Sequence, residues 1–183
     1  MNRRNLLTAA AVIAPAALLA GCGIVSTTST GGVTTVTIDV AKLDQLTVAL
    51  TSGAKTLLAN PLIAAAMGLT ADAAAQVILT SVAAAVAQID AQAGGKQVLT
   101  FNATSTPAAV ASLSADVAAL FKDAQAGVTG AGKSISSNVM QVYDAFQTVV
   151  ALIQVMIPST LVGAAKGGAK MVMPEAQALA ILG

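Results

Sequence analysis

The sequence predicts a mostly α-helical domain: an antiparallel bundle of four main Ala-rich helices, with room for a short two-stranded β element. Apolar residues recur at intervals of three and four over four stretches of about 20 residues. Proline and glycine separate these stretches, as expected at helix ends. Helices of this length, each roughly 30 Å long, suit antiparallel packing with short connections.

Two short strands are expected, over 33–38 and 96–101. Near the first, Val36, Ile38 and Val40 alternate with polar residues, which is the period of a half-buried strand. The second contains Val-Leu-Thr-Phe and could pair with the first.

The first helix is expected over 40–59, with Asp39 as its N-cap, because a carboxylate accepts hydrogen bonds from the free N–H groups of the first turn. Asn60 and Pro61 end this helix and begin a short turn up to Gly68. Its apolar face comprises Val40, Leu43, Leu46, Leu50, Ala54, Leu57 and Leu58.

The next helix is expected over 71–93, with Thr70 as its N-cap and the glycines at 94–95 as its end. A third helix is expected over 107–126, followed by a glycine-rich link at 127–134. The apolar face of the third helix comprises Val110, Leu113, Val117, Leu120, Phe121 and Ala124.

The strongest apolar face belongs to a fourth helix, expected over 137–157 and ended by Pro158. Tyr143 and Asp144 are expected to make a polar contact there. A last short helix is expected over 174–182. The apolar face of the fourth helix comprises Val139, Val142, Phe146, Val149, Val150, Ile153, Met156 and Ile157, and Gln141, Asp144, Gln147 and Gln154 form a narrow polar stripe opposite.

The composition excludes several chemistries. The chain has no His, which removes the usual general base and a common metal ligand, and its single Cys cannot form a disulfide within one chain. The eight carboxylates are scattered singly, so we expect no enzyme, cofactor or metal site. Charged residues are 9% of the chain, against about 25% in ordinary domains, and no basic stripe for nucleic acid exists. Such a surface favours contact with another surface, protein or lipid.

Two motifs resemble catalytic ones. Residues 127–134 match G-x-x-x-x-G-K-[ST], a loop whose backbone N–H groups cradle phosphates and whose Lys133 and Ser134 would hold phosphate and Mg²⁺. The segment before this loop has helical periodicity, whereas a phosphate loop follows a buried strand. We therefore predict a flexible link between helices.

The second motif is Ser-Gly-Ala-Lys at 52–55, which resembles the S-x-x-K of penicillin-recognising enzymes. Residues 136–138 and 166–168 resemble the later motifs of that family in order. The third motif belongs on a core strand, and here it lies in a glycine-rich link. Ser52 and Lys55 are therefore predicted to be polar-face residues of the first helix.

Residues 1–21 have the features of an export signal. Arg3 and Arg4 give a positive start, and an uncharged run over 5–21 follows, whose apolar part is shorter than the roughly 20 residues a bilayer span needs. Residues 2–7 resemble a twin-arginine signal, and the alternative is an ordinary secretory signal with two arginines.

Leu19, Ala20, Gly21 and Cys22 match the lipobox of bacterial lipoproteins at all four positions. The resemblance implies that Cys22 is acylated and that the chain is cut just before it. The alternative is an ordinary secretory signal with a chance Cys. Gly23, not Asp, follows the Cys, and by the sorting rule of enterobacterial lipoproteins this implies the outer membrane, facing the periplasm, more than the inner membrane.

The predicted organisation is a signal peptide at 1–21, a lipidated Cys with a flexible tether at 22–32, and a helical domain at 33–183. The expected function is that of a non-enzymatic, lipid-anchored envelope lipoprotein with a structural or protein-interaction role. Its partners would be the membrane, through the N-terminal lipid, and another protein or a second copy of the chain.

The alternative is a membrane-active protein in which the helix over 71–93 or 137–157 inserts and forms a pore or an envelope assembly. Residues 145–165 carry no charge, which favours this alternative. Gln147 and Gln154 lie inside that run and favour the first hypothesis.

Overall fold

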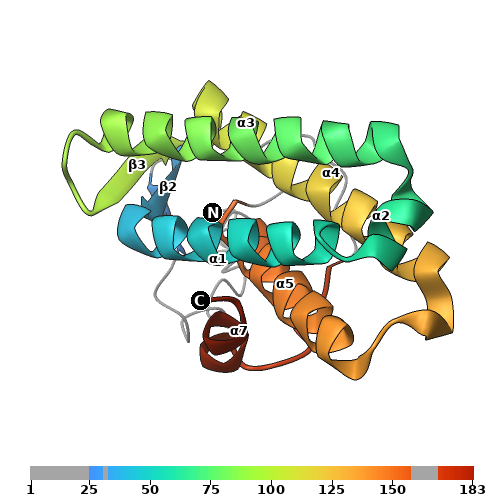
Figure 1. The fold of residues 1–183 in the computed structure, drawn as a ribbon. Helices are drawn as coiled ribbons and strands as arrows, with labels where there is room; N and C mark the ends of the chain where they lie inside the picture. Colours follow the sequence, from blue (N-terminus) through green and yellow to red (C-terminus); the bar gives the residue numbers. More distant parts are fainter. Residues whose placement is uncertain (1–24, 31–32, 158–168) are drawn as a thin grey trace, which may run out of the picture.

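The computed structural model describes residues 25–30, 33–157 and 169–183 (Figure 1). It is mostly helical with a small antiparallel sheet, which confirms the predicted fold class at this level. The long helices are α1 (Val40–Leu58), α3 (Leu69–Ala93), α4 (Ala108–Ala131) and α5 (Ser137–Met156). The short ones are α2 (Pro61–Met67), the 3₁₀ turn η1 (Gly132–Ser134) and α7 (Glu175–Leu182).

The sheet contains β1 (Val25–Thr30), β2 (Val33–Asp39) and β3 (Val98–Asn102), in the order β1-β2-β3. In the register of β2 and β3, Val36 lies opposite Phe101 and Ile38 opposite Leu99. Val36 and Ile38 are buried, as their alternation predicted. The predicted pairing of these two segments is confirmed.

The predicted flexible tether over 22–32 is wrong for the residues of β1. Val25 pairs with Ile38 and Thr30 with Val33, and the hydroxyls of Ser29 and Thr34 lie 3.1 Å apart. Threonine is β-branched and favours extended backbone. The side chains from Ser26 to Thr30 are all exposed, so β1 lacks the apolar alternation that reveals a strand.

Helix α1 begins as predicted. The Asp39 carboxylate accepts a hydrogen bond from the Lys42 backbone N–H at 2.9 Å, and the Val40 N–H donates to the Gln97 carbonyl at 2.9 Å. The second bond ties the start of α1 to the loop before β3. All seven residues of the predicted apolar face are buried, namely Val40, Leu43, Leu46, Leu50, Ala54, Leu57 and Leu58.

Helix α3 begins two residues before its predicted start, so the predicted Thr70 cap is wrong. Gly68 precedes the helix with φ +82, a conformation that glycine adopts without strain. The chain therefore turns from α2 directly into α3. At the other end, Gly94 has φ +61 and ends the helix as predicted.

Helix α4 continues to Ala131, so the predicted end at Gly127 and the flexible link over 127–134 are wrong. The reason is packing against α2. A Cβ on Gly127 would lie 2.7 Å from Ile63 Cγ2, and a Cβ on Gly130 would lie 3.0 Å from Ala66 Cβ. The two glycines allow α4 and α2 to approach closely inside continuous helix.

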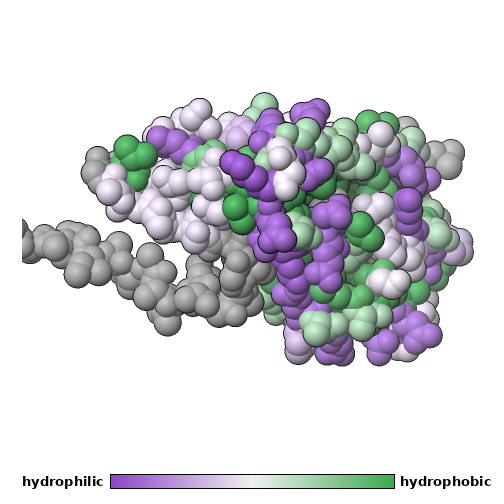
Figure 2. All heavy atoms as spheres, turned by 90° about the vertical axis from the view of Figure 1, so that its left-hand side faces the viewer, coloured by the Kyte–Doolittle hydropathy of each residue, from purple (hydrophilic) through white to green (hydrophobic). Residues whose placement is uncertain are grey.

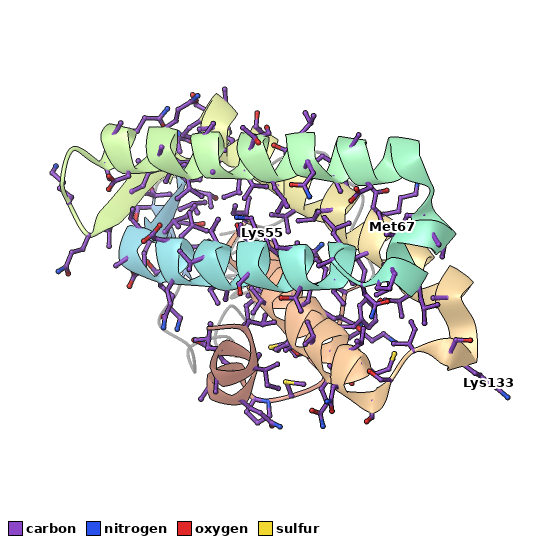
Figure 3. The ribbon with its side chains drawn as sticks, viewed as in Figure 1. Lys55, Met67 and Lys133 are labelled. Atoms are coloured by element: carbon purple, nitrogen blue, oxygen red, sulfur yellow. The ribbon has the colours of Figure 1, made fainter. Side chains whose placement is uncertain are left out.

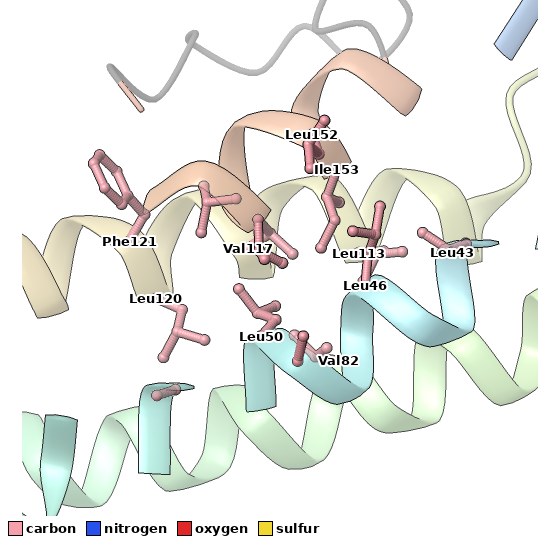
Figure 4. Packing of buried hydrophobic residues seen from close by; sticks show 14 of the residues in the cluster. Leu43, Leu46, Leu50, Val82, Leu113, Val117, Leu120, Phe121, Leu152 and Ile153 are labelled. Atoms are coloured by element: carbon pink, nitrogen blue, oxygen red, sulfur yellow. The ribbon is translucent and has the colours of Figure 1, made fainter. Parts of the chain in front are cut away.

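The long helices share one core (Figure 4). Helix α1 contacts α3 on one side and α5 on the other, and α3 also packs against α4. In Figure 1, α1 and α3 lie side by side, whereas α5 crosses α1 obliquely. The residues labelled in Figure 4 are Leu43, Leu46 and Leu50 of α1, Val82 of α3, Leu113, Val117, Leu120 and Phe121 of α4, and Leu152 and Ile153 of α5.

The C-terminal segment is held by polar contacts. Lys42 and Glu175 form an ion pair between α1 and α7, and the Val172 N–H donates to the Thr148 hydroxyl at 3.2 Å. Ala178 and Leu182 of α7 are also buried in the shared core, and this burial packs α7 against α1 and α5.

Two helices in the described part of the chain are long and apolar enough to cross a bilayer, judged by length and composition. In Asp72–Ala93, 33% of the most apolar window is buried inside the fold, and in Ser137–Met156 the share is 56%. A buried core helix passes the same test, and α5 packs against both α1 and α7.

Candidate functional site

An open groove of about 840 Å³ lies between α1 and α3. The two helices run antiparallel along it, because the start of α1 is bonded to the loop that follows α3. Its lining residues are Val40, Ala41, Asp44, Thr47, Val48, Thr51, Ser52 and Lys55 of α1, Ala83, Val86, Ala87 and Asp90 of α3, and Gly95, Lys96 and Gln97 of the following loop. Figure 2 shows a neighbouring face of the molecule, on which hydrophilic and hydrophobic side chains are mixed.

The α1 wall is a stripe beside the buried face of that helix. Its outer positions are spaced by three and four residues, which places them one above another along the helix. Val48 is 61% exposed in the middle of this stripe. We call these residues the α1 stripe: Ala41, Asp44, Val48, Thr51, Ser52 and Lys55.

Small side chains form the opposite wall. Ala83 and Ala87 are exposed on α3, while Val86 is buried beside them. Beneath the α1 stripe, the buried Thr47 hydroxyl donates to the Leu43 carbonyl at 2.8 Å, so its hydrogen bond is satisfied within α1. The floor of the groove is therefore apolar or internally bonded.

The groove carries opposite charges at its two ends. Asp44 and Asp90 line one end together with Lys96, and Lys55 lines the other end, where it lies between α1 and α3 in Figure 3. Asp44 and Lys55 are eleven positions apart on one helix, which corresponds to about 16 Å at 1.5 Å per residue. These charged side chains are exposed and flank an uncharged middle.

The predicted lipidation and signal residues lie outside the described residues: Arg3, Arg4, Leu19, Ala20, Gly21 and Cys22. Among the S-x-x-K residues, Ser52 and Lys55 line the groove, as polar-face residues of α1 do. Ser136 caps α5, with its hydroxyl accepting from the Val139 N–H at 3.4 Å. Residues 166–168 are not described.

The segment that matches the phosphate-loop motif does not have the conformation of a phosphate-binding loop. Its first five residues, 127–131, are helical, and Gly132–Ser134 form a 3₁₀ turn. In helical backbone the N–H groups lie along the helix axis. The N–H groups of residues 127–134 therefore cannot converge on a phosphate, as they do in a phosphate-binding loop. Lys133 projects from the end of the molecule away from the groove (Figure 3).

Tyr143 and Asp144 are neighbours on α5. Burial and then the nearby Asp144 carboxylate raise the pKa of Tyr143, so the phenol stays neutral at ordinary pH. Tyr143 is 8% exposed and belongs to the core. The backbone carbonyl of Asp144 accepts a hydrogen bond from the Thr148 hydroxyl at 2.9 Å.

Within residues 25–30, 33–157 and 169–183, no cluster of three or more His, Cys, Asp or Glu side chains could hold a metal ion. No family model, curated protein or solved structure matches this chain.

The sequence did not single out Asp44, Val48 or Asp90. One signal was available. Val48 is a large apolar residue on the polar side of α1, between Asp44 and Ser52, and its side chain is 61% exposed. Asp90 could only be placed beside Asp44 once the antiparallel packing of α1 and α3 was known.

Proposed function

We propose that this protein is an exported, lipid-anchored component of the bacterial envelope whose helical domain binds protein and catalyses no reaction. The anchor is supported by the match of Leu19 to Cys22 with the lipobox, directly after an apolar run and two arginines. The same resemblance supports the outer membrane, facing the periplasm, as its location.

The groove between α1 and α3 is the observation that carries the interaction role. It is long and open, its walls are two helices, and its middle is uncharged. These features suit a segment of folded protein better than a small polar substrate, which binds in a deeper site with converging polar groups.

An antiparallel bundle of the four long helices is part of this proposal. Its support is the shared core of α1, α3, α4 and α5 and the opposite directions of α1 and α3. The oblique crossing of α5 in Figure 1 is the feature that departs most from such a bundle.

A membrane-active role is the second candidate, and α3 is the observation that favours it. Residues 73–89 carry no charge, and only a third of the most apolar window of α3 is buried. Helix α5 gives less support, because more than half of its window is buried in the shared core.

Metabolic labelling with a fatty acid tests the anchor. The wild type should be labelled and Cys22→Ala should not, because the thiol is the proposed acylation site. Equal labelling of both chains would contradict the anchor.

Purification of the lipidated chain from membranes tests the interaction role. Ala87→Arg places a long cation in the groove, and Gln88→Arg introduces the same side chain at an exposed α3 residue that does not line the groove. We expect Ala87→Arg alone to lose the bound protein. Equal recovery with both variants would exclude the groove as the binding site.

A chain exported with a cleavable, non-lipid signal in place of residues 1–22 separates the two candidate functions. We expect it to leave the membrane on an alkaline wash. Retention in the pellet would favour the membrane-active role.

A further inference from the structure

The α1 stripe has charges arranged so that it complements itself when reversed. Asp44 and Lys55 lie near its two ends, with Val48 and Thr51 between them. If a second copy of the stripe is laid alongside in the opposite direction, with Asp44 facing Lys55, the same alignment places Val48 opposite Thr51. Both charge pairs then form at once, because a two-fold axis repeats every contact.

The groove also has the shape that such an arrangement needs. The positions of the α1 stripe recur at intervals of three and four residues, the spacing with which one helix packs along another. Ala83 and Ala87 leave space on the α3 side, so an incoming helix can lie between α1 and α3. Helix α1 of the second copy would fill this groove, and each copy would fill the groove of the other.

Asp90 strengthens the match at the acidic end. It lines the groove at the same end as Asp44 and Lys96, so an incoming lysine would face two carboxylates and one ammonium group, which together carry a net negative charge. At the opposite end, Lys55 would face the incoming Asp44. Opposite charges meet at both ends in the antiparallel alignment, whereas a parallel alignment would bring Asp44 against Asp44 and Lys55 against Lys55.

We propose that the occupant of the groove is α1 of a second copy of this chain, giving a two-fold symmetric dimer in which Asp44 of each copy pairs with Lys55 of the other. This inference rests on the proposed interaction role of the groove and names the partner. An acyl chain fits less well, because it would leave the charges at both ends without partners. A different protein is an outcome that the test distinguishes.

Charge reversal in two separate chains gives a specific test. Asp44→Lys would place a second ammonium group against Lys55 of the partner copy, and Lys55→Asp would place a second carboxylate against Asp44. Each variant should therefore dimerise about ten- to thirty-fold more weakly than wild type. When the two variants are mixed in equal amounts, a lysine faces an aspartate at both ends of the mixed dimer. We expect the mixture to dimerise more tightly than either variant alone but below the wild-type constant, because Asp90 still faces the new carboxylate at one end.

The measurement is sedimentation equilibrium of the full lipidated chain in density-matched detergent, with resonance energy transfer between differently labelled copies for the mixture. Lys133→Asp is the matched control, because it makes the same charge reversal at an exposed residue outside the groove, and it should dimerise as the wild type does. Circular dichroism should show equal helix content in all variants, since the changed side chains are exposed.

Three results would overturn the dimer: a monomeric wild type, single variants that dimerise as tightly as wild type, or a mixture that dimerises no more tightly than either variant alone. If the wild type is monomeric and Ala87→Arg still loses a different envelope protein, the dimer is wrong and the proposed interaction role stands. If Ala87→Arg loses nothing and the chain is monomeric, both fail.

Discussion

Substitution of Gly127 by alanine sets two opposing effects of known size against each other. In a helix interior the change normally stabilises by about 1 kcal/mol, because alanine loses less backbone entropy on folding. Here the new Cβ would lie 2.7 Å from both Ile63 Cγ2 and Met67 Cγ. Optimal carbon contacts are about 3.5–4 Å, and overpacking of this kind costs roughly 1–3 kcal/mol.

The steric effect should exceed the helix-propensity effect. Ile63 is fully buried and β-branched, so it cannot rotate away from the new methyl group. We expect Gly127→Ala to destabilise the protein by about 1 kcal/mol, combining a gain of about 1 with a loss of about 2. Gly130→Ala is the matched control, because its Cβ would meet only Ala66 closely, at 3.0 Å, and it should be close to neutral.

Urea unfolding followed by circular dichroism measures both changes as shifts in midpoint at constant slope. Met67→Ala completes a double-mutant cycle, since Met67 supplies part of the clash, and the double variant should be less destabilised than the sum of the single changes. Stabilisation by the full amount of about 1 kcal/mol in Gly127→Ala would refute the close approach of α2 and α4.

Three further changes test the described contacts. Lys133→Ala should leave stability unchanged, because the side chain is exposed, and micromolar nucleotide binding lost in this variant would contradict the helical geometry of the motif. Because the pKa of Tyr143 is raised in the folded protein, the stabilisation that its neutral phenol provides is present below about pH 10 and is lost as the pH rises above 10. Tyr143→Phe should remove this loss of stability at alkaline pH. The absorbance of the phenolate reports the titration, since the chain has a single tyrosine. Ile153→Asp should cost about 3–5 kcal/mol by burying an unpaired charge, whereas Val155→Asp, on an exposed side of the same helix, should change urea stability by less than about 0.5 kcal/mol.

The parts of the fold that local chemistry determines could be predicted from the sequence. The apolar positions of α1 and α4 are buried because their spacing places them on one side of a helix. Asp39 caps α1 because the carboxylate lies within reach of the third following N–H group. Neither result depends on another part of the chain.

The errors arise where a distant segment decides the local structure. Gly127 and Gly130 suggest a link when only their own stretch is considered, but contact with α2 favours glycine inside the helix. β1 contains polar residues typical of a tether, and its pairing with β2 makes it a strand. Predicting either requires the position of the partner element, which local periodicity does not contain.

The groove is a third case of the same kind. Ser52 and Lys55 were correctly predicted to lie on the polar side of α1, but the residues that face them come from α3 and the loop after it. Val48 was not singled out, although its apolar side chain stands there among polar neighbours.

The long helices α3 and α5 carry few charges for different reasons, and the buried share of each helix shows the difference. Helix α5 lacks charge because other helices surround it: α1, α4 and α7 all contact it, and its most apolar window is 56% buried. Helix α3 is uncharged over 73–89 and yet only 33% of its corresponding window is buried, so the core alone does not account for its composition. The groove accounts for part of that surface, because Ala83 and Ala87 would be covered by an incoming helix, and their small size is then a requirement of close helix contact. The charges that do occur at the groove, Asp44, Lys55 and Asp90, lie where they would determine the direction of that helix.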